Sequence, residues 1–440
     1  MIAKEYRNFR RSYSLGSTYL SRVFLVLGAL FCSQVLACPG AIFIGQLPHD
    51  VNAKREALRL FAAKPAGMGQ KWLEIPFQID SVDDRGRLVF DNENSNIRSS
   101  IKGQDLVTFK VEDFGAKATN PNQSGPCKAN QIFEIQRDRS QTFAYLAFCD
   151  DLGHGTNQES KITVAYDETQ AQLQSERYVY KFNTANYMLF DTIKFRRKDG
   201  IWEEIASDSR MLIRADAKHF FTMHFDSRHI ESKLEEKRIG PVASLARVSF
   251  FLRVLFLKIK MSLATDVGFF LDSGHIPMLL NLPVDANKYL HYGSGILYSW
   301  KSSTTAKLGK AEVLMPRLDP HLIKLGTKNL AEVGLRFCRG ETCMYRYTID
   351  LMGQILAMDI GIERSLVEKG FFPFFVEDVS SVRDTMGWSG EGVDAPGRNG
   401  MYFEVSGLEK GEHPWDFWLR LGAPAKSDST CPEPLSIRKI

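Results

Sequence analysis

Residues 71–80, KWLEIPFQID, place an aliphatic or aromatic side chain at every second position from 73 to 79. Successive side chains of a β-strand point to opposite faces of the sheet, so this period of two predicts a strand with one buried and one solvated face. Pro76 cannot donate a ladder hydrogen bond, which places the strand at the edge of its sheet. Similar stretches recur between turn-forming clusters along the chain, whereas helical periodicity is scarce. The sequence therefore predicts an all-β protein with few short helices.

Two β-sandwich domains are predicted, and the C-terminal one is the larger. The segment 167–176, DETQAQLQSE, has Leu173 as its only large apolar residue, which is typical of a linker or loop. The chain of 440 residues also exceeds the usual size of a single domain. We expect the N-terminal domain to span residues 38–170 and the C-terminal domain to span residues 171–440.

Within the larger domain, residues 242–271 form a long apolar stretch with charged residues at intervals. No window of about 18 residues is free of charge, which argues against a membrane-spanning helix. The alternating residues 258–263, KIKMSL, favour a pair of long central strands, and a buried helix is the alternative. The charged segment 226–238 just upstream is expected to be a solvated helix or a charged loop.

The N-terminus has the features of an export signal. Basic residues precede an apolar run at residues 23–37, which is shorter than the roughly 20 residues of a spanning helix and ends in the small-residue pattern VLA. We expect residues 1–37 to be a cleaved signal peptide and the mature protein to be secreted into the periplasm or to the cell surface. An uncleaved N-terminal anchor and a lipidated Cys38 are the alternatives, and only these would attach the protein to a membrane.

The predicted mature chain has no net charge. The leader holds five basic residues and one acidic residue of the chain's 56 and 52, so that 51 of each remain. Nothing in this balance suggests a nucleic-acid partner, because proteins that bind nucleic acids usually carry an excess of basic residues.

Six cysteines follow the predicted leader, an even number that is typical of disulfide bonds in exported proteins. Two of them flank a predicted hairpin and would face each other across its open end. Two more flank the four-residue turn RGET, and the last two lie near the mature termini. The predicted disulfide bonds are therefore Cys127 with Cys149, Cys338 with Cys343, and Cys38 with Cys431.

Clustered carboxylates indicate one candidate metal site. Residues 80–90, DSVDDRGRLVF, carry Asp80, Asp83 and Asp84 around a turn that contains a glycine. Calcium takes oxygen ligands, so these three side chains are the predicted Ca²⁺ ligands, and a plain hairpin turn is the alternative. No other cofactor is expected.

Aromatic residues near carboxylates and amides indicate a candidate sugar-binding site. They cluster at residues 288–300, KYLHYGSGILYSW, and around the glycine-rich loop 388–400. Sugar rings stack on aromatic faces while their hydroxyl groups form hydrogen bonds, although packing in a sandwich core would explain the same residues. The predicted ligand-binding residues are Tyr292, Trp300, Trp388 and Trp415.

No catalytic residue is predicted, because the sequence holds neither a GxSxG motif nor a phosphate-binding loop. Residues 75–90, IPFQIDSVDDRGRLVF, and 105–115, DLVTFKVEDFG, together with GSGILYSW at 293–300, resemble a family of exported bacterial β-sandwich proteins. The resemblance implies an exported location and a β-sandwich fold, and it transfers no catalytic residues.

These features predict an exported binding or structural protein that engages envelope polysaccharide. The alternatives are a carbohydrate-active lyase or hydrolase and a lipid-anchored envelope assembly factor. An enzyme should present two carboxylates, or a histidine and a tyrosine, within reach of one substrate bond. A binding module should instead present a flat platform of aromatic rings. Whether the protein is an enzyme is left open by the sequence.

Overall fold

The computed structural model shows an all-β protein, as the alternating sequence pattern predicts. Among the residues described below, the strands are accompanied by the short α-helices α3 (Ala286–Tyr289) and α4 (Arg364–Glu368) and by a 3-10 turn, η2 (Val111–Asp113). Within the described residues, no helix has the length and apolar content needed to cross a membrane. The structure describes residues 42–46, 52–54, 57–67, 69–83, 87–90, 100–102, 105–119, 121, 127–137, 141–149, 164–197, 199–218, 221–254, 257–282, 284–302, 311–313, 321–323, 330–332, 337–339, 342–351, 354–371, 373–376, 388, 398–424 and 435–439.

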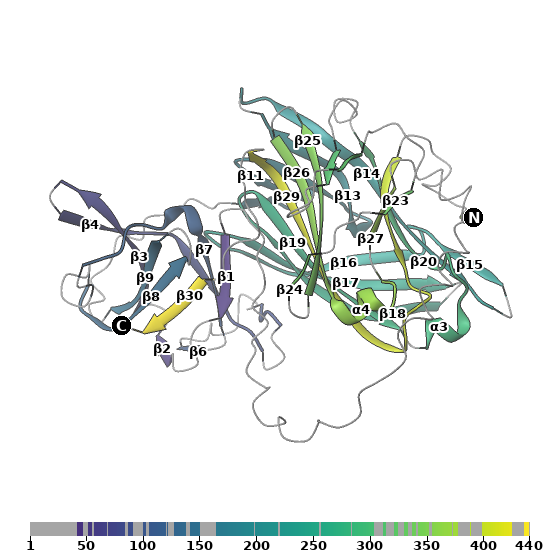
Figure 1. Ribbon diagram of the computed structural model, residues 1–440, viewed down its shortest axis with the longest axis horizontal. Helices are drawn as coiled ribbons and strands as arrows, with labels where there is room; N and C mark the ends of the chain where they lie inside the picture. Colours follow the sequence, from purple (N-terminus) through teal and green to yellow (C-terminus); the bar gives the residue numbers. More distant parts are fainter. Residues whose placement is uncertain are drawn as a thin grey trace, which may run out of the picture. The chain divides into compact units, whose positions relative to one another are not determined.

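The smaller sandwich consists of a five-stranded sheet and a three-stranded sheet (Figure 1). Leu60, Phe133 and Leu146 from the first sheet and Val107 and Phe109 from the second belong to one buried cluster. In β3, β7 and β9, alternate side chains belong to this cluster, as the pleat of a strand requires. The five strands are, in order, β30 (Leu435–Lys439), β8 (Ala129–Arg137), β9 (Thr142–Cys149), β3 (Leu58–Ala66) and β4 (Gly69–Glu74); the three are β1 (Ile42–Gln46), β7 (Leu106–Lys110) and β5 (Phe77–Asp80), while β2 (Asn52–Lys54) and β6 (Ser100–Lys102) pair separately.

Residues 71–80 form two strands, which corrects the prediction of a single edge strand. Pro76 lies between β4 and β5, and these strands belong to the two different sheets of the smaller sandwich. Proline cannot continue a ladder, so the chain leaves one sheet and enters the other at this point. Ile75 and Ile79 are buried as predicted, whereas Leu73 near the end of β4 is exposed.

The predicted disulfide bond between Cys127 and Cys149 is confirmed. The Cα atoms of the two residues are 5.7 Å apart, which is an ordinary separation for a disulfide. The bond joins the start of β8 to the end of β9. Both cysteines pack in a second apolar cluster, on the face of the five-stranded sheet that points away from the core of the smaller sandwich.

Replacing both Cys127 and Cys149 with serine is expected to lower the free energy of unfolding by about 3 kcal/mol. The bond joins residues 22 positions apart, and its loss increases the conformational freedom of the unfolded chain. Urea denaturation of the wild type and the double variant under the same oxidising conditions measures the difference. A loss below about 1 kcal/mol would show that the bond adds little constraint to the unfolded chain.

The other predicted disulfide bonds are described only in part. Cys343 is disulfide-bonded, and Cys338 in the neighbouring strand is its register partner. Cys38 and Cys431, the third predicted pair, lie outside the described residues. The predicted signal peptide, residues 1–37, lies outside them as well.

The larger sandwich encloses the main core of the chain between two layers of strands. Tyr180 from the first layer and Phe269 from the second have ring centroids 5.1 Å apart, and a parallel bridge between Asn186 and Ser232 connects the layers at one edge. The first layer contains β10 (Val164–Asp167), β11 (Gln172–Ser175), β12 (Tyr178–Asn183), β13 (Asn186–Arg196), β14 (Trp202–Asp216), β15 (Thr222–Phe225), β20 (Gly295–Ser302), β28 (Arg398–Glu404), β27 (Pro373–Val376) and β23 (Leu330–Glu332); the second contains β16 (Ile230–Ile239), β17 (Ser244–Val254), β18 (Leu257–Phe269), β19 (Ser273–Leu282), β29 (Gly411–Pro424), β26 (Gln354–Glu363), β25 (Thr342–Leu351), β24 (Phe337–Arg339), β21 (Ala311–Val313) and β22 (His321–Ile323).

Two strands lie in one of the predicted domain ranges, 38–170 and 171–440, but pair with strands of the other. The last described strand, β30, returns to the smaller sandwich and pairs with β8. The strand β10 begins the first layer of the larger sandwich by pairing with β11. The division of the chain into two independently folding domains stays a prediction.

The long strand pair predicted within residues 242–271 is confirmed, because β17 and β18 pair antiparallel. The prediction of a linker or loop at 167–176 is wrong, since this segment contains β11, which pairs with β10 and β12. Leu173 is the only large apolar residue here, and its burial in the core is enough to fix so short a strand.

The prediction of a helix or charged loop at residues 226–238 is also wrong. The strand β16 covers most of this segment, and its side chains alternate between more buried and exposed positions. Glu236 and Arg238 occupy the more buried positions because each has an ion-pair partner: Glu236 pairs with Arg247 over 2.9 Å and Arg238 pairs with Asp80 over 3.2 Å. Charged residues that are paired in this way can satisfy the alternating pattern of a strand.

Candidate functional site

An exposed aromatic patch lies where β14 ends and β20 begins. The patch consists of Phe221, Tyr289 and Tyr292, which are 65%, 53% and 71% exposed. Two backbone hydrogen bonds bring its segments together. The amide of Lys218 donates to the carbonyl of Tyr289 over 2.9 Å, and the amide of Ala217 donates to the carbonyl of Phe221 over 3.4 Å. Grouped exposed apolar side chains mark interaction surfaces more often than scattered ones do. The aromatic patch is therefore a candidate binding surface.

A charged pair adjoins the patch at the end of β14. Arg214 Nη2 donates to Asp216 Oδ2 over 2.9 Å, and Arg214 Nη1 donates to the carbonyl of Gly293 over 3.2 Å. The hydroxyl group of Thr222 donates to Asp216 Oδ1 over 2.9 Å. The buried Nε of Arg214 has no hydrogen-bond partner within the described structure. The pair is therefore held by the two Nη groups of Arg214 and by the Thr222 hydroxyl group.

Glu404 at the end of β28 holds the turn that carries Tyr292. Its carboxylate accepts hydrogen bonds from the Tyr402 hydroxyl over 2.5 Å, from the Gly293 amide over 2.9 Å and from the Ser406 amide over 3.1 Å. Burial raises the pKa of Tyr402 well above its ordinary value, and the neighbouring Glu404 carboxylate raises it further. Tyr402 therefore stays protonated and serves as a donor to Glu404 across the physiological pH range.

Two glycines allow the turn to approach this network. Gly293 has a φ angle of +91°, and a Cβ atom added to it would lie 3.0 Å from Arg214 Nη1. A Cβ atom on Gly295 would lie 2.2 Å from the carbonyl oxygen of Phe403, which is closer than real contacts allow. The motif Gly293-Ser294-Gly295 is thus required by the backbone, and it fixes the position of the neighbouring Tyr292.

The strands that carry these residues have two different faces. Arg214 lies opposite Gly295 in the register of β14 and β20, and Gly295 in turn lies opposite Glu404 of β28. Adjacent positions point to the other side, where Ile213 and Ile296 face the core. We call the side that carries Arg214 and Glu404 the outer face and the side that faces the core the inner face.

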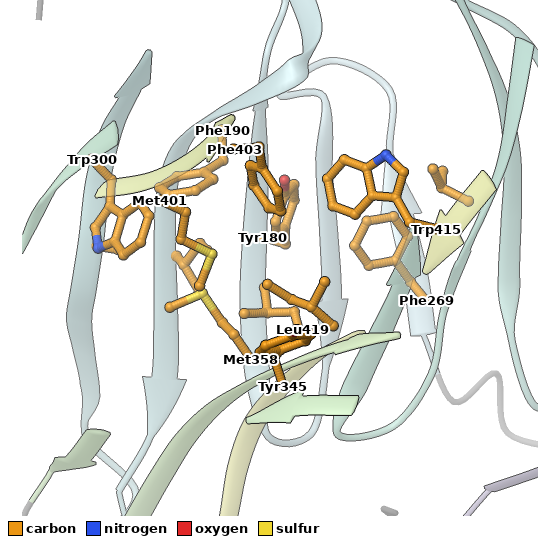
Figure 2. Close-up of a cluster of buried hydrophobic side chains, with 14 of the residues drawn as sticks. Tyr180, Phe190, Phe269, Trp300, Tyr345, Met358, Met401, Phe403, Trp415 and Leu419 are labelled. Carbon is orange, nitrogen blue, oxygen red and sulfur yellow. The ribbon is translucent and has the colours of Figure 1, made fainter. Parts of the chain in front are cut away.

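The structure separates the four predicted ligand-binding residues into two groups. Tyr292 belongs to the aromatic patch, and the buried ring of Trp388 meets that of Tyr402 edge to face at 5.6 Å, which associates it with the outer face. Trp300 and Trp415 belong instead to the buried core cluster, and they are only 3% and 9% exposed (Figure 2). The sandwich core therefore accounts for these two residues.

The described carboxylates of the predicted calcium site form ion pairs. Asp80 pairs with Arg238 over 3.2 Å and also accepts hydrogen bonds from Gln78, while Asp83 pairs with Arg87 over 3.0 Å. Asp84 lies outside the described residues. Among the residues that the structure describes, no group of three or more acidic, histidine or cysteine side chains is arranged to hold a metal ion.

Three residues of the site were not predicted from the sequence: Phe221, Arg214 and Glu404. Phe221 directly precedes β15, and Arg214 and Glu404 come from strands that are 190 positions apart in the chain. Their common neighbour, the glycine pair around Ser294, was visible as a turn, and the need for close backbone approach there was the one available signal.

No protein-family model matches this chain, and no curated protein matches its sequence significantly. Among solved structures, an alpha-mannosidase from Enterococcus faecalis V583 is similar with a TM-score of 0.37 at 8% identity, over 90% of this chain and 47% of that one. A protein in the glycosyl hydrolase family 38 from Enterococcus faecalis has a TM-score of 0.39 at 8% identity, over 90% of this chain and 48% of that one. This chain spans about half the length of these two structures.

Proposed function

We propose that this protein is an exported glycan-binding protein and that the aromatic patch stacks on the sugar rings of an envelope polysaccharide. The exposure of Phe221, Tyr289 and Tyr292 at one place carries the proposal. A sugar ring has an apolar face that suits an aromatic side chain and hydroxyl groups that require polar partners. The partly exposed Asp216 supplies such a partner next to the patch.

The hydrogen bonds of the outer face favour binding over catalysis. Both oxygens of Asp216 accept hydrogen bonds from protein donors, Arg214 and Thr222. Glu404 is buried and accepts three hydrogen bonds that hold the backbone and Tyr402 in place. A general acid or base needs a carboxylate that reaches a substrate bond, whereas both of these carboxylates are used to position the site. A carbohydrate-active lyase or hydrolase is therefore the less favoured alternative.

Export to the periplasm or the cell surface is part of the proposal. The disulfide between Cys127 and Cys149 supports an oxidising compartment, and the predicted leader at residues 1–37 supplies the route. The intact mass of the protein purified from its native envelope, measured with and without reductant, tests this step. A mass that includes residues 1–37, or that does not change on reduction, would contradict it, and an added lipid mass would identify Cys38 as an anchor instead.

Replacing Tyr292 with alanine is expected to weaken glycan binding about tenfold or more, because burying one aromatic side chain against a ligand contributes roughly 1.5 to 3 kcal/mol. An array of bacterial envelope polysaccharides identifies a bound glycan, and calorimetric titration with that glycan measures the affinity. Tyr292→Phe keeps the ring and should retain most of the affinity. Because Tyr292 is 71% exposed, the free energy of unfolding should change by less than about 0.5 kcal/mol.

Ile201→Ala is the matched control. Ile201 is 58% exposed and lies beside the first residue of β14, at the opposite end of that strand from Asp216. Its replacement removes a comparable exposed apolar side chain and should leave the affinity unchanged. Equal glycan affinities for the wild type and Tyr292→Ala would show that the aromatic patch is not the binding surface.

A further inference from the structure

The two layers of the larger sandwich leave a cavity between their inner faces. Its volume is about 180 Å³, and both layers line it: Tyr180 and Trp300 come from the first layer, and Phe269 and Leu419 from the second. Protein interiors usually hold few voids larger than a water molecule. Apolar side chains that face such a space lack packing partners, and an occupant would supply them.

The lining of the cavity selects an apolar occupant. No charged side chain lines it among the described residues, and the hydroxyl groups of Thr265 and Tyr298 are already bound to the backbone carbonyls of Pro277 and Met188. Burial also raises the pKa of Tyr298, which therefore stays uncharged. Apolar cavities exclude water, and one of roughly 150 Å³ in another protein binds benzene. By proportion, this cavity has room for about seven carbon atoms.

Methionine is prominent in the lining. Five of the chain's 13 methionines face the cavity, and Figure 2 shows two of them, Met358 and Met401, between the rings of Trp300 and Trp415. Unbranched thioether side chains change shape easily and are common at surfaces that adapt to variable apolar ligands. This composition is suited to a guest rather than to a rigidly packed core.

The lining runs along the strands. Ile276, Met278, Leu279 and Leu280 of β19 line the cavity, and residues 415–419 of the paired strand β29 do so at every second position. Five residues of a strand span about 13 Å, so the lining extends further along the strands than one ring would reach. An elongated occupant fits this geometry better than a compact one.

We infer that the inner cavity binds one unbranched hydrocarbon chain, such as the end of a fatty acyl group. The site is separate from the aromatic patch, because Ile213 lines the cavity while the next residue, Arg214, belongs to the outer face. The inference therefore does not rest on glycan binding, and each site can be changed without changing the other.

Titration of the purified full chain with octanoate tests the inference. With ¹³C-methyl-labelled methionine, the signals of the cavity methionines are expected to shift, and the melting temperature should rise with octanoate concentration, because a ligand that binds only the folded state stabilises it. The affected signals are assigned with single Met→Leu variants at positions 188, 211, 278, 358 and 401. Benzene at the same concentration should have a smaller effect.

Ala206→Leu provides the cavity-filling variant. Ala206 is buried and lines the cavity, so the larger side chain should occupy the space. The melting temperature without ligand should be equal or higher, and the affinity for octanoate should fall at least tenfold. Ala63→Leu is the matched control in the close-packed cluster beside the disulfide, where added volume has no space and should lower the melting temperature.

The named outcomes decide the inference. Octanoate-dependent shifts in the wild type that disappear in Ala206→Leu support it. It is overturned if saturating octanoate leaves the cavity methionines unchanged, if Ala206→Leu responds like the wild type, or if benzene binds more tightly than octanoate. A Tyr292→Ala variant should respond to octanoate like the wild type, which keeps this result independent of the glycan experiment.

Discussion

Asp208→Asn is expected to lower the free energy of unfolding by about 3 to 5 kcal/mol. The Asp208 carboxylate pairs with Arg398 over 3.0 Å, with Arg210 over 2.7 Å and with Lys301 over 2.9 Å. The side chain of Arg398 is only 2% exposed, so removal of the carboxylate charge leaves a buried guanidinium without this partner. Asparagine keeps the shape of the side chain and tolerates the φ angle of +50° at this position, so the loss reports the charge alone. Urea denaturation measures it.

The same variant should change the dependence of stability on pH. Burial raises the pKa of Asp208, but the hydrogen bond from Lys301 and the charges of Arg398 and Arg210 lower it by more, so that the net pKa lies below its ordinary value of 3.8. A carboxyl whose pKa is lower in the folded state contributes stability above pH 3.8 and loses it as the pH falls through the folded value. The difference in stability between the wild type and Asp208→Asn should therefore be full near neutral pH and shrink in acid.

Asp199→Asn is the matched control for this substitution. Asp199 pairs with Arg197 over 3.0 Å at the turn before β14, and both side chains are more than 40% exposed. Exposed pairs contribute about 0 to 1 kcal/mol, so the control should lose little. If the two variants lose a similar free energy of unfolding, the burial of Arg398 does not increase the contribution of Asp208 to stability.

The all-β fold was predictable because alternation along a strand is a local property. It is visible in β9, where Phe143, Tyr145 and Ala147 belong to one apolar cluster and the alternating Ala144, Leu146 and Phe148 to another. The strands β11 and β16 were not predicted, because their inward positions are few or charged. In β16, Arg238 occupies a partly buried position, where Asp80, 158 positions earlier, supplies a carboxylate. Such a partner is set by the tertiary fold and leaves no mark on the local pattern.

The candidate site was predictable only in part. Tyr292 was predicted because it lies in a cluster of aromatic residues, and the structure puts it on an exposed surface. Trp300 lies eight positions further on and was predicted on the same grounds, yet it faces the core, because even-numbered residues of β20 point inward. Residue type alone does not determine which face a side chain takes. That choice depends on the register of β20 with β14 and β28, which the sequence does not specify.

Trp415→Ala is expected to lower the free energy of unfolding by about 3 to 5 kcal/mol, the usual cost of removing a buried aromatic side chain. The Trp415 ring lies 4.6 Å from that of Phe403 and 6.0 Å from that of Phe371, and the residue also lines the inner cavity. Its removal takes away these contacts and enlarges a cavity that already exists. Urea denaturation of this variant beside Tyr292→Ala compares a buried with an exposed aromatic residue, since the two were predicted as members of one sugar-binding set.

The two variants should show opposite profiles. Tyr292 is exposed on the outer side of the first layer, whereas Trp415, from the second layer, packs in the core between the layers. Tyr292→Ala should lose glycan affinity and keep its stability, whereas Trp415→Ala should lose stability while its remaining folded molecules bind glycan normally. Trp415→Ala should also bind a longer or bulkier hydrocarbon than the wild type, because the indole side chain no longer limits the inner cavity. A Trp415→Ala protein with unchanged stability and weakened glycan binding would place this residue on the sugar-binding surface and contradict its role in the core.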